Sequence, residues 1–355
     1  MLYSGIDLHR DNSMITTVND SGTIINQQKL PNDEVALLNY FLSMGNEHRA
    51  VVEATANWYW LSDLLNDHGI DLILAHAKYL KAISYAKVKT DKVDSQTLAN
   101  LLRIDMVPTA HQIQPRLRPL RDLMRARLNL VHKNTSCQNS IHRLLGKYNQ
   151  NIPQGKKLHD LSTLDTLNDL SLPQEAFLQL ELLKEQIRLL HRQINDLEKT
   201  LHPKLIPNPD IQRLLWIPGI GKILAFTIYL EVDGIDRFQG TPQFLSYSRL
   251  VPGADNSNRK NKHKSANKDG NKYLKLAFTE AAVRAIQYFR EIKDFYLTKQ
   301  RKKHNNIARI LVAQELAKIC YHVLKNKTDF NNTFKGKNLS RRKSLQWPRL
   351  ASPDA

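Results

Sequence analysis

Four acidic residues have the types and spacing that suit metal-dependent chemistry on a phosphate group. In the stretch K-V-K-T-D-K-V-D-S, Asp91 and Asp94 lie three residues apart, so a helix would place both carboxylates on one face. Like charges this close repel and raise each other's pKa, which favours a cation bound between them. Three neighbouring lysines leave open a solvated, salt-bridged surface instead: Lys87, Lys89 and Lys92.

The segments that must position these carboxylates alternate between strand and helix patterns. Asp7 and Glu53 each end a short apolar segment with a strand pattern. The predicted order β-β-β-α-β-α-β-α is that of the ribonuclease H and RuvC nuclease fold. The predicted strands are Leu2–Asp7, Ser13–Val18, Thr23–Leu30, Ala50–Glu53 and Ile70–Ala75, and the predicted helices are Asp33–Met44, Trp58–His68 and most of Lys78–Leu102.

In that fold a central sheet would bring Asp7 and Glu53 side by side, with Asp91 and Asp94 on a helix packed across them. Four converging carboxylates are costly unless a metal ion neutralises them. Oxygen ligands of this kind select Mg²⁺ or Mn²⁺, and paired ions can assist phosphoryl transfer. Taken singly, Asp7 is more often a strand-end cap and Glu53 is more often a surface acid, so the prediction rests on the joint arrangement.

The opening strand ending in Asp7 also occurs in sugar kinases of the actin-like class. Those proteins continue with a Gly/Thr phosphate loop, whereas Leu8, His9 and Arg10 follow here. The sequence has no glycine-rich phosphate cradle downstream, so it favours the nuclease interpretation.

The composition predicts a polyanionic partner. The chain has 355 residues, enough for two or three domains, and a formal net charge of +18, which points to nucleic acid. No long apolar run indicates a membrane segment, and the N-terminus has no signal-peptide pattern. Two scattered cysteines, Cys137 and Cys320, form neither a disulfide framework nor a zinc motif. We therefore expect a cytoplasmic protein without membrane contact.

Three motifs carry a specific family resemblance. G-I-D-L-H at residues 5–9, V-V-E-A-T at 51–55 and K-T-D-K-V-D-S at 89–95 resemble the N-terminal domain of the DEDD transposases of insertion-sequence family one hundred and ten. These are bridge-RNA-guided serine recombinases, similar to the Piv DNA invertases. Two positions depart from the family pattern, because Ala56 replaces a glycine and Ser95 replaces an alanine. Both residues are small, so neither departure affects the expected metal site.

Residues 111–205 read as basic helices followed by a coiled-coil segment. After a proline-containing linker, a helix from Leu120 to Tyr148 carries many cations, and we expect Arg121 and Arg125 to contact phosphates rather than solvent alone. Apolar residues at alternating steps of three and four, from Leu180 to Leu201, give a coiled-coil period. This stripe could join two subunits, as the resemblance implies, or pack against the preceding helix of its own chain.

The sequence I-P-G-I-G-K at residues 217–222 lies between two helical segments. It resembles a helix-hairpin-helix, in which backbone amides meet a DNA phosphate. Gly219 and Gly221 would permit the turn and Lys222 would face the phosphate. A tight corner between two helices, without nucleic acid, is the alternative.

The segment from Leu250 to Lys275 is almost free of apolar residues and predicts a basic loop. Its cations could seat a phosphate backbone: Arg259, Lys260, Lys262, Lys264, Lys268 and Lys272. In the resembled family a serine five residues after the loop's proline is the nucleophile, which corresponds to Ser257 here. The family's Ser-Gly is Ser257-Asn258 in this chain, and Ser265 remains the second choice. Amphipathic helices are predicted at Tyr273–Tyr288 and His304–Leu324.

These patterns divide the chain into a RuvC-like domain at 1–110, the basic and coiled-coil segment at 111–205, a C-terminal helical domain at 206–330 and a basic, flexible tail at 331–355. By resemblance, the protein is a DNA transposase that forms a serine-linked intermediate, with Mg²⁺ or Mn²⁺ at the DEDD site, as a homodimer or homotetramer with a structured guide RNA. The resemblance also implies a prokaryotic, nucleoid-associated protein. The alternatives are a RuvC-like junction resolvase that uses water and a non-catalytic nucleic-acid-binding protein.

Overall fold

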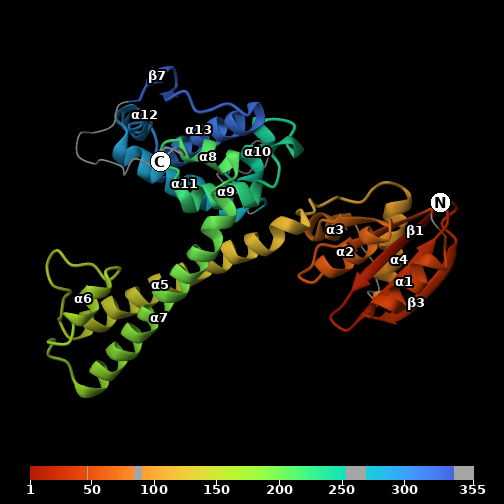
Figure 1. Ribbon diagram of the computed structural model, residues 1–355, viewed down its shortest axis with the longest axis horizontal. Coiled ribbons are helices and arrows are strands. Elements are labelled where there is room, and N and C mark those ends of the chain that lie inside the picture. Colours follow the sequence, from red (N-terminus) through yellow and green to blue (C-terminus); the bar gives the residue numbers. More distant parts are fainter. Residues whose placement is uncertain (46, 84–89, 253–268, 340–355) are drawn as a thin grey trace. The chain divides into compact units, whose positions relative to one another are not determined.

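The computed structural model describes residues 1–45, 47–83, 90–252 and 269–339. These residues form two compact units, one within Met1–Pro115 and one within Arg116–Ala355 (Figure 1). The first unit is mixed α/β and the second is almost entirely helical. This confirms the predicted combination of an α/β N-terminal part with a helical C-terminal part.

The first unit is built on a five-stranded sheet with the strand order β3-β2-β1-β4-β5. An antiparallel meander is formed by β1 (Leu2–Leu8), β2 (Asn12–Val18) and β3 (Ile24–Pro31). Two further strands, β4 (His48–Glu53) and β5 (Asp71–Ala75), run parallel to β1. Each strand predicted from the sequence is present, with ends that differ by two residues at most.

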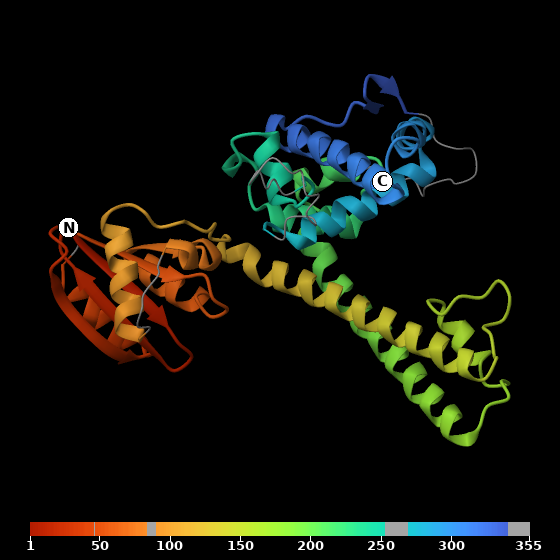
Figure 2. The same cartoon turned by 180° about the vertical axis from the view of Figure 1, so that it is seen from behind.

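Helices cover both faces of this sheet. On one face, α1 (Glu34–Leu42) and α2 (Tyr59–Asp67) pack against a cluster that includes Ile6 and Val52. On the other face, α3 (Ala77–Ile83) and α4 (Asp91–Arg103) pack against Val51 and Ala75. Figure 2 shows α4 lying across this second face. The N-terminal helices predicted from apolar spacing are therefore present.

A glycine decides how closely α4 approaches the sheet. Gly5 is buried at the centre of β1, and a Cβ atom there would overlap the backbone of Ser95 and Ala99 in α4. Ser95 is fully buried and its hydroxyl group is hydrogen-bonded to the Thr16 hydroxyl of β2 at 2.7 Å. Small residues at positions 5, 95 and 99 thus let the part of α4 that follows its first turn lie directly over β1.

The second unit begins with a helical hairpin. η1 (Pro115–Leu117) leads into α5 (Arg118–Lys147), and α7 (Gln174–Leu205) returns along it after the short helix α6 (Leu161–Asp165). Contacts from Arg127 to Glu198 at one end and from Cys137 to Gln186 farther along show that the two helices are antiparallel.

The apolar stripe predicted as a coiled coil is the α7 side of this hairpin. Leu180, Ile187, Leu190 and Leu201 are buried, and the first two join a cluster with Ile141 of α5. The second of the two alternatives for this stripe, packing against the preceding helix of the same chain, is therefore present. A subunit contact through α7 stays a prediction.

The remainder of the second unit is a helical bundle followed by a short hairpin. The helical segments predicted around I-P-G-I-G-K correspond to α8 and α9, and the two amphipathic helices predicted after the basic loop correspond to α11 and α13, whereas α12 was not predicted. Residues 331–339, which we expected in a flexible tail, form a hairpin whose Phe334 is buried against Phe295. The elements are α8 (Pro209–Leu215), α9 (Lys222–Val232), η2 (Ile235–Arg237), α10 (Thr241–Tyr247), α11 (Lys272–Tyr288), α12 (Arg290–Gln300), α13 (Asn305–Asn326), β6 (Thr333–Phe334) and β7 (Lys337–Asn338).

Candidate active site

Two of the four carboxylates lie on neighbouring strands at one edge of the sheet. Asp7 and Glu53 are each one position beyond the Ile6–Val52 pair of the parallel strands β1 and β4. Side chains alternate along a strand, and Ile6 and Val52 face α1 and α2. Asp7 and Glu53 therefore face the side on which α4 lies.

The other two carboxylates enter from the first turn of α4. Thr90 caps this helix, with its hydroxyl oxygen accepting a hydrogen bond from the Val93 amide at 3.3 Å, and Asp91 and Asp94 follow in the first turn. The positive end of the helix dipole favours acidic residues here, which partly offsets their mutual repulsion. Gly5 admits the following part of α4 onto β1, and His9 contacts both Asp7 and Asp91, so this turn lies near the end of the strand that carries Asp7.

The pKa of Asp7 is affected by the other three acids of the predicted site. Burial raises the pKa of the Asp7 carboxyl, and the charges of Asp91, Asp94 and Glu53 raise it further, while His9 opposes the rise. Asp7 therefore lies within electrostatic range of each of the other three carboxylates. All four side chains are partly open to solvent, so the cluster is accessible to an ion or a phosphate.

His9 lies among these acids, although sequence reasoning assigned it no role. Its Nε2 atom is 3.3 Å from Asp7 Oδ2 and 3.4 Å from Asp91 Oδ2. Lys29 contributes a second cation, with Nζ 3.9 Å from Asp91 Oδ2. One ligand atom each from Asp7, His9 and Asp91 lies within 4.8 Å of the others, close enough to share one ion. The carboxylate oxygens suit a hard divalent cation, so the residues present fit the metal ion that the sequence predicted.

The cations predicted near this cluster are only partly described. Lys92 is exposed on α4, and its backbone carbonyl accepts a hydrogen bond from Gln27. Lys87 and Lys89 lie outside the described residues.

The P-G-I-G turn connects α8 to α9, and its two glycines differ in whether the structure requires a glycine at that position. Gly219 has a φ of 80°, and a Cβ atom there would overlap the backbone carbonyl of Ala281 in α11. Gly221 has an ordinary φ of −93° as the N-cap of α9, and no atom lies within 4 Å of where its Cβ would be. Lys222 is exposed beside this open helix end, with Nζ 3.2 Å from His202 Nε2.

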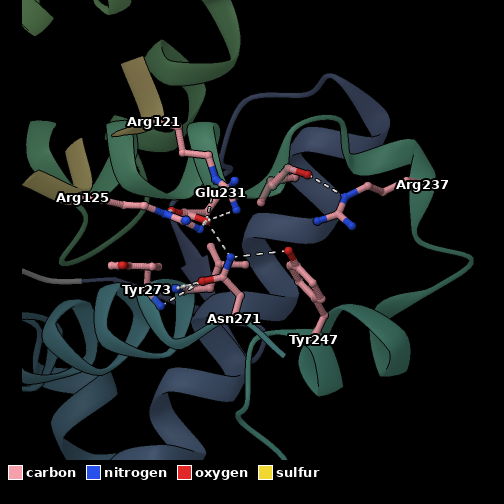
Figure 3. A network of polar contacts seen from close by, with 9 residues as sticks. Arg121, Arg125, Glu231, Arg237, Tyr247, Asn271 and Tyr273 are labelled. Carbon is pink, nitrogen blue, oxygen red and sulfur yellow. Dashed lines mark hydrogen bonds and ion pairs between the residues drawn. The ribbon is translucent and has the colours of Figure 1, made fainter. Parts of the chain in front are cut away.

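Arg121 and Arg125, which we expected to contact phosphates, are engaged by a buried carboxylate (Figure 3). Glu231 of α9 is 3% exposed; its Oε2 is 3.0 Å from Arg121 and its Oε1 is 2.6 Å from Arg125. Burial opposes ionisation, but the hydrogen bond from Arg125 and the charges of both arginines outweigh it and lower the Glu231 pKa. These arginines thus join α5 to α9, and their phosphate contacts stay a prediction.

The same carboxylate reaches the segment that follows the predicted serine loop. Asn271 Nδ2 donates a hydrogen bond to Glu231 Oε2 at 2.7 Å, while its Oδ1 accepts from the first amides of α11, including that of Tyr273 (Figure 3). The Asn271 amide also donates to the Tyr247 carbonyl at 2.6 Å, and Arg249 Nε donates to the Gly270 carbonyl at 2.7 Å. The chain segments before and after the loop are therefore joined to each other.

Most of the predicted serine loop lies outside the described residues. This applies to Ser257, to the second choice Ser265, and to the predicted cations Arg259, Lys260, Lys262, Lys264 and Lys268. Lys272 is described, in the first turn of α11, where its Nζ lies 5.1 Å from the centre of the Tyr273 ring.

Comparisons with known proteins identify a family for both units. Residues 4–150 match the model of the DEDD transposase domain of IS110 elements, and residues 211–297 match the model described as the transposase IS116/IS110/IS902 family. These two stretches together cover more than half of the chain. The chain belongs to the IS110 family of transposases. Transposases cleave and rejoin DNA, so the family implies an enzyme of DNA transposition that binds DNA as its substrate.

Individual relatives agree with the family over most of the chain. The transposase for insertion sequence element IS1328 of Yersinia enterocolitica is 22% identical over 92% of this chain and 98% of its own length. The transposase for insertion sequence element IS1111A of Coxiella burnetii is 23% identical, over 82% and 79% respectively. A probable family 20 transposase of Pseudomonas aeruginosa is 24% identical, over 76% and 81%. None of the described helices is both long and apolar enough to cross a membrane.

Proposed function

We propose that this IS110-family transposase uses Asp7, Glu53, Asp91 and Asp94 as a divalent-metal site for DNA strand exchange. The observation that carries the proposal is that Asp7 and Glu53 end the neighbouring parallel strands β1 and β4, while Asp91 and Asp94 enter from the first turn of α4 on the same side of the sheet. The strand order β3-β2-β1-β4-β5, with β2 antiparallel to β1, supports assignment of the first unit to the ribonuclease H and RuvC-like fold.

Mg²⁺ is the ion we assign to this site, with Mn²⁺ as its substitute, because hard oxygen ligands dominate the cluster. When bound, such an ion polarises a phosphate and neutralises charge on a departing oxygen. The role of the four carboxylates is to hold the ion at the open edge of the sheet. Without it their mutual repulsion disfavours the fully ionised cluster.

Ser257 is the nucleophile we assign by resemblance. Its Oγ would form a bond to the scissile phosphorus while the bond from phosphorus to the 3′ oxygen breaks, and the 3′ oxygen leaves as a hydroxyl group. That hydroxyl group, on the exchanged strand, then attacks the phosphoserine and releases the serine. The junction formed by Tyr247, Arg249, Gly270 and Asn271 supports this assignment, because it holds together the two chain segments that flank residues 251–269.

The nucleic-acid partners and the assembly are part of the same proposal. The net charge of +18 and the open N-terminus of α9 beside Lys222 support binding of DNA and of a structured guide RNA through their phosphates. Assembly as a homodimer or homotetramer is supported by leucines on α7 that remain exposed. Leu178, Leu182 and Leu189 are 62%, 52% and 43% exposed.

The proposal is tested on a denaturing gel with labelled donor and target DNA, Mg²⁺ and RNA transcribed from the flanks of the element. We expect a covalent protein–DNA adduct with wild-type protein and with Ser265→Ala, but none with Ser257→Ala or Asp94→Asn. Cleaved DNA without an adduct in both the wild type and Ser257→Ala would instead identify a resolvase that uses water. Salt-sensitive binding without cleavage or any effect of metal would identify a non-catalytic binding protein.

A further inference from the structure

His9 occupies a position in the acidic cluster that the four-acid site does not explain. Its ring nitrogen Nε2 lies between a strand carboxylate and a helix carboxylate, 3.3 Å from Asp7 and 3.4 Å from Asp91. The imidazole therefore bridges the two elements, β1 and α4, that together build the site. Its side chain is 45% exposed, so the ring is placed at the mouth of the cluster and not in the core.

The backbone of His9 is held in place from three directions. Its amide donates a hydrogen bond to the Asn12 carbonyl at 3.0 Å, across the turn between β1 and β2. Its own carbonyl accepts hydrogen bonds from Asn32 Nδ2 at 3.0 Å and from Asn57 Nδ2 at 2.9 Å. Thr55 in turn donates to Asn57 Oδ1 at 2.9 Å.

This framework ties His9 to the strand ends that carry the acids. Asn57 and Thr55 belong to the segment that follows Glu53, and Asn32 follows directly after β3. Two amide side chains from separate loops thus converge on one carbonyl group. A surface histidine with no role needs no such support, whereas a metal ligand must be held close to its final position.

We propose that His9 Nε2 is a fifth ligand of the divalent ion, in addition to the four acids. The inference rests on the proposed metal site. Ligand atoms that share one ion at about 2.1 Å lie roughly 3–4 Å from each other. The separations of Nε2 from the two carboxylate oxygens fall within this range. The alternative, an ion pair that holds β1 and α4 together without touching the metal, is an outcome of the test.

A nitrogen ligand changes which ion the site prefers. Imidazole is a softer ligand than a carboxylate, and Mn²⁺, as a first-row transition metal, accepts a nitrogen ligand more readily than Mg²⁺ does. We therefore expect His9→Gln to weaken Mn²⁺ binding about tenfold or more and to weaken Mg²⁺ binding less. The selectivity for Mn²⁺ over Mg²⁺ should fall accordingly, measured by competition in full-length protein without DNA.

The direct experiment is pulsed electron paramagnetic resonance of Mn²⁺ bound to full-length protein labelled with ¹⁵N in histidine only. We expect a ¹⁵N coupling in the wild type and its loss in His9→Gln. His68→Gln is the matched control, because this exposed histidine contacts its own helix, with Nδ1 2.9 Å from the Leu64 carbonyl. The control should keep the coupling. Asp7→Asn tests the site itself and should lower the amount of bound Mn²⁺.

Each outcome separates the two proposals. If Asp7→Asn lowers Mn²⁺ binding but the wild type has no ¹⁵N coupling, His9 is not a ligand and the acidic metal site stands. If the coupling persists in His9→Gln, another histidine binds the ion and the inference is overturned. If Asp7→Asn leaves Mn²⁺ binding unchanged, or the wild type binds none, both the inference and the metal site fail.

Discussion

At the scale of single residues, the titratable side chains of the first unit differ in their access to solvent. The pKa of Asp7 is raised, yet its side chain remains partly exposed, as a ligand of an ion must be. His48, at the start of β4, is buried, and its side chain has almost no access to solvent. Its Nε2 is 2.6 Å from the Ser4 hydroxyl, while its Nδ1 has no hydrogen-bond partner among the described residues. Protonation would bury a charge and an unpaired donor.

This environment predicts a pH dependence of stability. Burial lowers the pKa of His48 from 6.5 to about 4, so below pH 6.5 the unfolded chain takes up a proton that the folded chain resists. The free energy of unfolding should therefore fall by about 3 kcal/mol from this group between pH 7 and pH 4. Denaturant titrations of wild type and His48→Gln should differ in this pH slope. Equal slopes would contradict the assignment.

At the scale of elements, three glycines permit close contacts between elements, whereas Gly221 makes no such contact. Gly5 and Gly219 admit the backbones of α4 and α11, so a side chain at either position would displace a helix. Gly270 likewise lies against the Tyr247 carbonyl at the junction of the predicted serine loop. Gly221, by contrast, has open space and a permitted backbone conformation. Its glycine is therefore free to serve a partner outside the chain.

Replacing Gly221 should move stability and DNA binding in opposite directions. Gly221→Asp provides a capping carboxylate for α9, which we expect to stabilise the fold by about 0.5 kcal/mol. The same charge would repel a phosphate at this helix end and weaken DNA binding about tenfold. Gly221→Ser is the matched control, since it caps the helix without charge. Thermal unfolding and filter binding measure the two effects, and unchanged DNA affinity in Gly221→Asp would leave only a tight corner.

The Glu231 cluster predicts a large structural effect. Glu231→Gln removes the buried charge shared by Arg121 and Arg125 and should destabilise the second unit by about 3–5 kcal/mol. Because its pKa is lowered below 4.5, its contribution is present above that pH and is lost as the pH falls through the folded value. The pair of Arg127 with Glu198 is the comparison, because its carboxylate is 35% exposed, and Glu198→Gln should cost less than Glu231→Gln.

Denaturant unfolding at pH 7 and at pH 3.5 tests the cluster. The difference between wild type and Glu231→Gln should shrink at the lower pH. A difference that does not depend on pH would mean that the carboxylate contributes by shape and not by charge.

At the scale of the whole molecule, the residues to which we assign catalytic roles are divided between the two units. The acids and His9 lie in residues 1–115, and the loop assigned to the serine belongs to residues 116–355. Each unit has its own apolar clusters, one set on the sheet and another between α5 and α7. All the residues that we propose as metal ligands lie within the first unit.

Residues 1–115 expressed alone should therefore fold and bind Mn²⁺. We expect a cooperative thermal transition that rises in temperature with added Mn²⁺ and is insensitive to it in Asp7→Asn. The isolated unit should form no adduct with DNA because the assigned serine is missing. A fragment without a cooperative transition would show that its sheet depends on the second unit.

Much of the first unit and of its acidic set was predictable from the sequence. Strand and helix periods are local properties, so patterns a few residues long predict the five strands and the acid-bearing helix. The same patterns predict where on these elements the four acids lie: Asp7, Glu53, Asp91 and Asp94. The same holds for α11 and α13. The motifs in both halves were also sufficient to suggest the family that the comparisons identify.

Only the tertiary structure decided the contacts between distant segments. No local signal tells that Glu231, more than a hundred residues away, holds Arg121 and Arg125, or that Asn32 and Asn57 support His9. The heptad stripe of α7 likewise specifies an apolar face but not its partner, which is α5. Periodicity records which side of an element is buried, whereas pairing depends on the shape and charge of surfaces that meet only after the chain has folded.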